Sequence, residues 1–238
     1  MLNSLKGVKI VNPPSTNLMY LSFTPRFLQD IFPDLIWRVN TLDRKIFLTF
    51  DDGPIPEVTP WVLDTLAAFD AKASFFCVGQ NVERNPEIFD RIESEGHAVG
   101  SHTHHHLSGW ATNNLDYILD IRKAARLCHS KLFRPPYGRL RPSQVKFLKH
   151  HYQIVMWDVL SGDFDPDLSR EDCLNNILKN AREGSIVVMH DSIKTFEKLK
   201  YVLPRTLEHY SSIGFRFEAL QGASMAFSGR MPELVNQL

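Results

Sequence analysis

Short apolar runs alternate with longer amphipathic stretches along most of the chain. The apolar runs are rich in Phe, Val and Ile, and each is short enough to form one β-strand. Several are apolar at consecutive positions, as in Ile186-Val187-Val188-Met189, which is typical of a strand buried on both faces of a parallel sheet. The predicted strands are Lys45–Phe50, Ala73–Val78, Ala98–Gly100, Leu132–Arg134, Tyr152–Trp157, Ser185–His190 and Phe215–Leu220.

The amphipathic stretches between these runs predict helices, and several carry signals for their ends. Thr59 is suited to cap the first helix, with Pro60 at its first helical position. Ser169 predicts an N-cap with an acidic residue three positions later, and Pro204 is expected to kink or split the last helix. The predicted helices are Thr59–Phe69, Asn85–Glu95, Thr112–His129, Cys173–Arg182 and Thr195–Ser212.

Alternating strands and helices indicate right-handed crossovers and one parallel sheet. Seven such units fit a closed or nearly closed α/β barrel with helices outside, or an open doubly wound sheet. In either case, functional residues are expected at the carboxyl ends of the strands. Residues 1–43 fall outside the pattern and predict an N-terminal extension packed on a domain formed by residues 44–238, with Ile36–Val39 as a candidate extra strand.

Charge and composition exclude several classes of function. The chain has 27 Lys and Arg against 27 Asp and Glu, and this balance argues against nucleic acid or an anionic membrane as the main partner. No apolar run approaches the ~20 residues of a transmembrane segment, and no continuous apolar stretch near the start predicts a secretory signal. Cys77, Cys128 and Cys173 are too scattered for a disulfide framework, so a reduced, cytoplasmic setting is expected.

Histidine is unevenly distributed, because five of the ten histidines fall between His97 and His106. His102 and His106 are four residues apart, so on one helical turn they would share a face and bind one metal ion. His102 with His105 is the competing pair. An exposed His-rich turn without a dedicated metal is the alternative interpretation.

Two adjacent carboxylates, Asp51 and Asp52, follow the first predicted strand in the sequence TFDDGP. Adjacent side chains near a strand end point in different directions, so one can bind a metal while the other acts as a free base. Asp52 with two neutral imidazoles would make a three-ligand site with an open position for water. An ordinary Asp-Gly-Pro turn is the alternative.

Arg134 closes another strand in the sequence FRPPYG and brings a fixed charge that can hold a carboxylate through two parallel hydrogen bonds. Because Pro135 and Pro136 have no N–H group, the next free backbone donor is that of Tyr137. A surface proline turn with a solvated Arg is the alternative. The pattern therefore predicts a charge and a donor at the same edge as the acidic pair.

The last two strand ends carry Asp158 and Asp163 after the fifth strand and His190 at the end of the sixth. Each has a structural alternative, as a solvated acid or a hydrogen-bonded histidine. Taken in order, however, five strand ends present paired Asp, paired His, Arg, Asp and His at the edge where sites are expected. This arrangement predicts one catalytic site.

The sequences TFDDGP, SHTHHH, RPPYG, SGDF and VVMHD occur in this order between Thr49 and Asp191. They resemble the five motifs of the NodB-homology polysaccharide deacetylases, carbohydrate esterase family 4. The resemblance implies a distorted (β/α)7 barrel and a hydrolase that removes N-acetyl groups from amino sugars. The implied substrate is an acetylated amino sugar in a polysaccharide or oligosaccharide of the chitooligosaccharide or peptidoglycan type.

The resemblance also assigns roles at the matching positions. Leu160 and Phe164 depart from the fourth motif, where the family usually has an acidic residue and Trp, and Val188 replaces Leu in the fifth. Whether Asp163 or Asp158 partners the catalytic histidine stays open. The implied roles are Asp51 as the base held by Arg134, Asp52, His102 and His106 as metal ligands, the Tyr137 N–H as an oxyanion donor, and His190 as the acid paired with Asp163.

The implied cofactor is a divalent metal, for which a His₂Asp ligand set favours Zn²⁺, while Co²⁺, Ni²⁺, Mn²⁺ and Fe²⁺ accept the same ligands. Trp110 is predicted at the mouth as a sugar-stacking platform, with core packing as the alternative. Pro136, Phe164 and Val188 are the other predicted substrate contacts. Rival functions are a deformylase or small-molecule amidase on the same barrel, a catalytically silent carbohydrate-binding homologue, and an interaction protein with a decorative His cluster. No oligomeric state is predicted.

Overall fold

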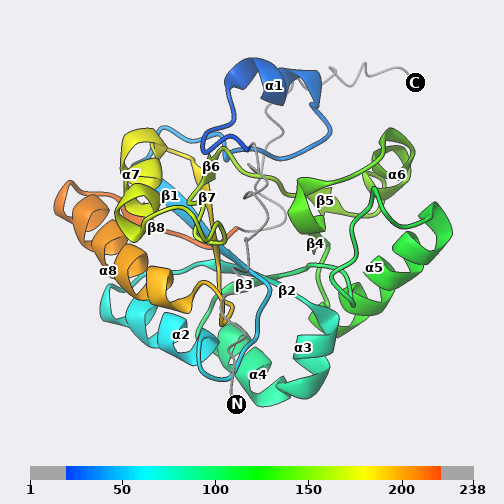
Figure 1. Ribbon diagram of the computed structural model, residues 1–238, viewed down its shortest axis with the longest axis horizontal. Coiled ribbons are helices and arrows are strands. Elements are labelled where there is room, and N and C mark those ends of the chain that lie inside the picture. The colour runs from blue at the N-terminus through cyan, green and yellow to red at the C-terminus, as the bar shows by residue number, and fades with distance from the viewer. Residues whose placement is uncertain (1–19, 221–238) are drawn as a thin grey trace, which may run out of the picture.

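The computed structural model describes residues 20–220, whose parallel strands form one strongly curved sheet (Figure 1). The hydrogen-bonded order is β5-β4-β3-β2-β1-β7-β6, and β8 pairs with the start of β1. This curled sheet with helices outside it matches the predicted barrel rather than a flat doubly wound sheet. The strands are β1 (Lys45–Asp51), β2 (Ser74–Cys77), β3 (Ala98–Ser101), β4 (Leu132–Phe133), β5 (Gln153–Ile154), β6 (Val159–Leu160), β7 (Ile186–His190) and β8 (Arg216–Phe217).

Helices surround the sheet, with α7 and α8 on one flank and α5 and α6 on the opposite flank (Figure 1). All five predicted helices are present, and each differs from its predicted bounds by only a few residues. Three short helices, α1, α3 and α6, were not predicted because their six or seven residues hold too few turns for a periodic pattern. The helices are α1 (Arg26–Ile31), α2 (Thr59–Ala68), α3 (Gly79–Arg84), α4 (Pro86–Ser94), α5 (Asn114–Cys128), α6 (Pro142–Leu148), α7 (Arg170–Asn180) and α8 (Phe196–Ser212).

The helix-end signals were confirmed in part. The Ser169 side chain accepts a hydrogen bond from the Asp172 N–H and caps α7 as predicted. The prediction for Thr59 was wrong: it lies inside α2, and its hydroxyl accepts from the Ile55 N–H and donates to Asp191. α8 continues through Pro204 as one helix, because packing of its buried face outweighs one lost backbone hydrogen bond.

The gap between the edge strands β5 and β6 is covered by the segment that precedes β1. The Ile36 N–H donates to the Ile154 carbonyl, and Phe23 forms an antiparallel bridge with Val159. Ile36 and Arg38 each form a single bridge, so Ile36–Val39 is not a strand. The predicted strand Tyr152–Trp157 is reduced to the two residues of β5, and Val155 after it forms a bridge with Ile36 of this segment. The division at residue 44 stays a prediction.

Buried apolar clusters lie on both faces of the sheet, with Ile46 and Leu48 of β1 packed toward the helices and Phe47 packed on the inner face. β1, β2 and β7 are almost entirely buried, as their continuous apolar runs predicted. A second cluster under α5 and α6 includes Leu35 and Trp37 from the segment before β1. The three cysteines are buried free thiols. Within residues 20–220, no helix is both long and apolar enough to cross a membrane.

Candidate active site

The strand register brings the predicted polar residues to one edge of the sheet. Asp51 at the end of β1 pairs in register with His190 at the end of β7. On the other side, Ser101 of β3 pairs with Phe133 of β4, so the residues that follow them, His102 and Arg134, are also neighbours. The prediction that these polar residues gather at the carboxyl ends of the strands is confirmed.

Asp52, His102 and His106 form the metal-ligand cluster of the described residues, with one ligand atom from each lying within 4.8 Å of the others. The Asp52 Oδ1 atom lies 3.2 Å from His106 Nε2 and 3.9 Å from His102 Nε2. It is buried and has no hydrogen bond of good geometry within the described part of the chain. An orphaned carboxylate oxygen between two imidazole nitrogens fits a divalent metal with three protein ligands.

The tautomer of His102 also suits a metal ligand. Its Nδ1 atom lies 2.8 Å from the Arg134 carbonyl, which can only accept, so Nδ1 carries the proton and Nε2 keeps its lone pair. Burial lowers the pKa of His102 to about 4, which keeps the ring neutral near pH 7. For Asp52, burial alone raises the pKa, but the contact with His106 and the nearby His190 and His102 hold it well below its usual range.

The loop that carries the histidines is not helical, so the predicted geometry of that pair was wrong although the pair itself lies together. Thr103 and His106 have φ angles of 59° and 54°, which place them in the left-handed region. This path turns His106 toward Asp52. It turns His105 the other way, where its Nδ1 contacts Asp120, so His105 is not part of the cluster.

Asp120 on α5 holds this loop, and the sequence analysis missed it. One of its carboxylate oxygens accepts from the N–H groups of both His104 and His105, at 2.8 and 3.0 Å. The residue is buried, with 7% exposure. An acidic residue on the buried stripe of an amphipathic helix, beside Tyr117 and Ile121, was the available signal.

Asp51 and Arg134 form a buried ion pair beside the metal-ligand cluster. Arg134 Nη1 donates to Asp51 Oδ1 and to Thr49 Oγ1, both at 2.7 Å. The remaining guanidinium hydrogen bonds go to the carbonyls of Val155 and Met156. The prediction of two parallel hydrogen bonds is therefore wrong. Only Nη1 donates to Asp51, because Nε and Nη2 donate to the Val155 and Met156 carbonyls.

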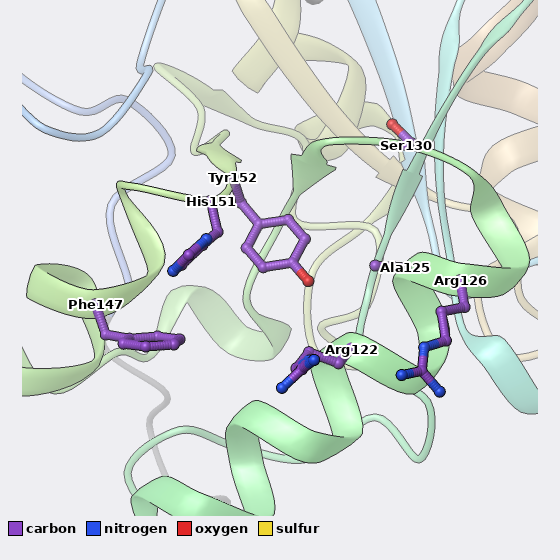
Figure 2. Close-up of a pocket in the computed structure, with 7 residues that line it drawn as sticks. All are labelled: Arg122, Ala125, Arg126, Ser130, Phe147, His151 and Tyr152. Atoms are coloured by element: carbon purple, nitrogen blue, oxygen red, sulfur yellow. The ribbon is translucent and has the colours of Figure 1, made fainter.

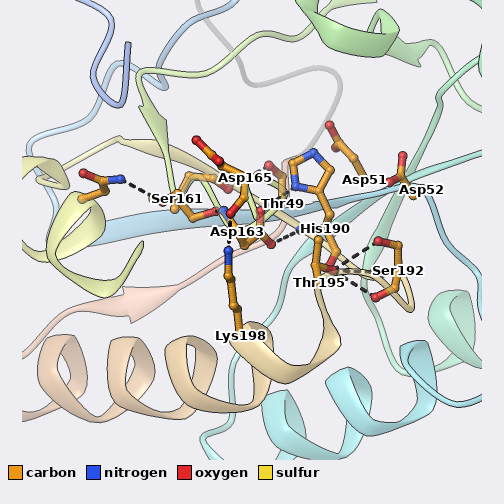
Figure 3. A network of polar contacts seen from close by, with 12 residues as sticks. Thr49, Asp51, Asp52, Ser161, Asp163, Asp165, His190, Ser192, Thr195 and Lys198 are labelled. Carbon is orange, nitrogen blue, oxygen red and sulfur yellow. Dashed lines mark hydrogen bonds and ion pairs between the residues drawn. The ribbon is translucent and has the colours of Figure 1, made fainter. Parts of the chain in front are cut away.

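His190 and Asp163 form the second charged pair of the site (Figure 3). His190 Nδ1 and its backbone N–H lie 2.8 Å from the two oxygens of Asp163. Burial alone lowers the pKa of His190, but Asp163, with Asp52 and Asp51 nearby, raises it to about 10. Asp158 is elsewhere, bonded to Ser185 and 3.4 Å from Arg38, so the geometry selects Asp163 as the partner.

Tyr137 follows the two prolines as predicted and has a φ angle of 61°. Such a conformation is costly for a residue with a Cβ and is found mostly at functional sites. No acceptor lies at its N–H among residues 20–220, so this donor is free for a ligand. Its ring lies 4.9 Å from that of His106 and is 61% exposed.

The other predicted substrate contacts lie in different surroundings. The Phe164 ring lies 5.4 Å from His190, and Tyr20 packs on it from the segment before β1. Trp110 is 59% exposed, so it is not a core residue. Leu160 and Val188 pair in register, and both are buried. Pro136 is also buried, and substrate contact by Pro136 and Val188 stays a prediction.

Asp191 is a second residue that the sequence analysis missed. Its Oδ1 accepts from the Gly53 N–H at 2.9 Å and its Oδ2 from the Thr59 hydroxyl at 2.6 Å. A Cβ at position 53 would lie 2.0 Å from Asp191 Oδ2, so only glycine allows this approach. Burial raises the pKa of Asp191 to about 8. It fixes the turn that presents Asp52.

A cavity of about 420 Å³ lies away from this site, between α5, α6 and the amino ends of β4 and β5 (Figure 2). Arg122, Arg126 and Tyr152 are among the side chains that line it. Ser130 and Tyr152 precede β4 and β5, whereas the charged pairs described above follow strand ends. The cavity is therefore separate from the candidate active site.

Comparison with known proteins identifies the same family as the motifs. Residues 38–153 match the family described as polysaccharide deacetylase. A peptidoglycan-N-acetylglucosamine deacetylase of Bacillus cereus is 36% identical over 193 residues, which are 76% of this chain and 88% of that protein. A chitooligosaccharide deacetylase of Azorhizobium caulinodans is 31% identical, with 70% of this chain and 90% of that protein covered.

The fold comparison agrees. A crystal structure of a peptidoglycan N-acetylglucosamine deacetylase in complex with an N-oxidanyl-benzamide superposes with a TM-score of 0.74 at 32% identity. The superposition covers 81% of this chain and 92% of that one, which confirms the distorted (β/α)7 barrel. Longer relatives are matched over less of their length: this chain spans 56% and 38% of two other peptidoglycan deacetylases.

Proposed function

This chain belongs to the polysaccharide deacetylase family, and we propose that it hydrolyses the N-acetyl groups of amino sugars in a glycan of the peptidoglycan or chitooligosaccharide type. The observation that carries this proposal is the cluster of Asp52, His102 and His106, together with Asp51 and His190, which pair in register at the ends of β1 and β7 (Figure 3). An amide has a poor leaving group, so its hydrolysis needs a base, an oxyanion site and an acid together.

A divalent metal held by Asp52, His102 and His106 would polarise the acetyl carbonyl and lower the pKa of water from ~16 towards ~7. The neutral imidazole of His102 and the orphaned oxygen of Asp52 support this role. Zn²⁺ suits two imidazoles and one carboxylate, and Co²⁺, Ni²⁺, Mn²⁺ and Fe²⁺ are the alternatives that a metal analysis separates.

Asp51 is the proposed general base. Asp51 is 3% exposed and bonded to Arg134, and in this role its carboxylate accepts a proton from the attacking water. Arg134 also holds the carboxylate in one orientation, because its other hydrogen bonds go to Thr49 of β1 and to the Val155 and Met156 carbonyls just after β5. The base and the metal ligands then share one rigid support, since the Arg134 carbonyl orients His102.

His190 is the proposed general acid, and the Tyr137 N–H is the proposed oxyanion donor. Asp163 keeps His190 protonated near neutral pH, so that it can give a proton to the departing amine. Tyr137, whose N–H is free, adjoins the cluster through the contact of its ring with His106. A preorganised donor of this kind contributes about 3–4 kcal/mol to stabilisation of an oxyanion.

A glycan chain is favoured over a small amide because exposed aromatic rings lie near the cluster. Tyr137, whose ring lies against His106, is 61% exposed, and Trp110 on the loop after the ligand histidines is 59% exposed, whereas a small-molecule amidase would need covering loops. The substrate is proposed from this exposure and from the names of the relatives. The cytoplasmic setting stays a prediction.

Metal analysis of the purified protein, followed by acetate release from chitooligosaccharides and peptidoglycan, tests the proposal. We expect one divalent ion per chain and acetate from at least one of these glycans. Formate release from formylated amino sugars without acetate release would indicate a deformylase instead. One bound metal without any release across both panels would indicate a silent carbohydrate-binding homologue, and absence of bound metal would overturn the proposed site.

A further inference from the structure

A row of exposed groups leads away from the metal-ligand cluster across the surface. It starts at His106, whose ring lies 4.9 Å from that of Tyr137. The Arg139 guanidinium follows, 5.6 Å from the Tyr137 ring and 5.3 Å from the Trp110 ring. We name Tyr137, Arg139 and Trp110 the aromatic–arginine row. It continues the proposed active site toward the side of α5 and α6.

The aromatic–arginine row is held in place by hydrogen bonds between two loops. Trp110 Nε1 donates to the Leu140 carbonyl at 3.1 Å, and Arg141 Nη2 donates to the Trp110 carbonyl at 2.7 Å. Gln144, which is fully buried, donates to the Gly109 carbonyl at 2.9 Å. An exposed indole fixed at its N–H and its backbone presents its face at little entropic cost on binding.

The charge of Arg139 is available to a ligand. Within residues 20–220, its guanidinium stacks between two rings and has no carboxylate or carbonyl acceptor. By contrast, Arg134 and Arg141 both use their guanidinium donors inside the protein. A planar guanidinium with free donors binds a carboxylate through two hydrogen bonds, and aromatic faces bind the apolar faces of sugar rings.

We propose that the aromatic–arginine row is a subsite for a carboxylate-bearing saccharide, linked in the same glycan strand to the sugar whose N-acetyl group is hydrolysed. Tyr137 and Trp110 stack on sugar rings, and Arg139 binds the carboxylate. This inference rests on the proposed function and narrows its substrate: glycans with acidic sugars are preferred over neutral chitooligosaccharides.

The test compares two forms of one substrate. Peptide-free peptidoglycan strands carry a free lactyl carboxylate on each muramic acid, and chemical reduction turns these carboxylates into alcohols. The wild-type protein should bind the carboxylate strands more tightly, and Arg139→Gln should raise their Kd and KM about fivefold. The kcat should not change. Binding of the reduced strands should be equal in both proteins.

Two further variants separate charge from stacking. Arg139→Lys keeps the charge but not the planar fork, so it should recover part of the loss. Trp110→Ala should weaken both forms of the strand, because stacking does not depend on the carboxylate. Arg205→Gln is the matched control: Arg205 also stacks on a tyrosine, 3.8 Å from the Tyr201 ring, but on α8 at the opposite flank (Figure 1). Arg205→Gln should leave the Kd and KM of both strand forms unchanged.

The outcomes distinguish this subsite from the proposed function. Equal Kd values for both forms in the wild-type protein, unchanged by Arg139→Gln, would overturn the subsite even if acetate is released. Discrimination between the two forms in Kd without acetate release from either would support the subsite and overturn the proposed activity. An equal loss on both forms in Arg139→Gln would indicate a structural role for Arg139 and would also overturn the subsite.

Discussion

His102 follows β3 and His190 ends β7, two strands on opposite sides of β1, and the two histidines differ in the atom that faces their Nδ1 nitrogen. For His102 that atom is a backbone carbonyl of Arg134, and for His190 it is a carboxylate oxygen of Asp163, each at 2.8 Å. Burial lowers the pKa of both rings. It prevails at His102, whose pKa falls to about 4, whereas Asp163 raises that of His190 to about 10.

The comparison shows how one residue type serves two functions at one edge of a sheet. A neutral imidazole with its proton fixed on Nδ1 offers a lone pair to a metal, and an imidazolium offers a proton to a leaving group. Pairs of titratable groups whose environments move their pKa values apart are typical of acid–base sites. The predictions below test each side of this division.

The largest effect is expected from removing a metal ligand. His102→Ala should abolish stoichiometric metal binding and lower kcat/KM about a thousandfold or more, because a three-ligand site loses its neutral, oriented imidazole. Metal content by mass spectrometry and acetate release measure this. His105→Ala is the matched control from the same loop and should keep its metal. Loss of metal in His105→Ala as well as in His102→Ala would instead indicate His102 with His105 as the ligand pair.

Asp51→Asn tests the base, which both histidines flank. The variant should retain one metal per chain, since Asp51 is outside the ligand cluster, while kcat falls by about 10²–10⁴-fold. Asn keeps the shape of the side chain and still accepts a hydrogen bond from Arg134. Turnover close to that of the wild-type protein would remove Asp51 from the role.

Asp163→Asn replaces the charged acceptor at His190 Nδ1 by an uncharged one, as at His102. Without the carboxylate, the pKa of His190 should fall from about 10, which NMR of the metal-free protein at increasing pH can follow. The raised pKa of protonated His190 stabilises the folded wild-type protein fully at pH values below the ordinary pKa of His, and this stabilisation is lost as the pH rises toward 10. The difference in free energy of unfolding between wild type and variant should therefore narrow between these two pH values.

The same variant should lose about 10²-fold in kcat near pH 7, and the alkaline limb of its pH profile should move to lower pH. Asp165→Asn removes a nearby acidic group that bonds to Tyr20 rather than to His190, so it serves as the control. An unchanged His190 titration in Asp163→Asn would contradict the role of Asp163.

The location of the site was predictable from the sequence because parallel strands must bring their carboxyl ends together. Asp51, His102, Arg134 and His190 each end or follow an apolar run, so their meeting needed no knowledge of the loops. The choice between Asp158 and Asp163 as the partner of His190, by contrast, required knowledge of the loops. Asp158 is turned toward Arg38, in a segment that forms isolated bridges with the sheet, and the local sequence does not indicate which acid this arginine contacts.

The path of the ligand loop could not be predicted for a similar reason. A spacing of four residues suggested one helical turn, but Thr103 and His106 adopt positive φ angles instead. Their conformation depends on Asp120, which follows His104 by 16 residues and belongs to a helix on the outside of the barrel. The spacing of the histidines carries no information about a contact with a distant residue. The only signal for this contact was an acidic residue on the buried face of α5.

Asp120→Asn should have the smallest effect, because it weakens the support of the ligand side without touching a ligand. Asparagine keeps one oxygen acceptor for the N–H groups of His104 and His105 but loses the charge, so the metal Kd should rise about tenfold. At saturating metal, kcat should be unchanged, since Asp51 and His190 are unaffected. Asp116→Asn, an exposed position on the same helix, is the control. A loss of kcat at saturating metal would mean that Asp120 supports the whole reaction centre, and the division between the His102 and His190 sides would then be incomplete.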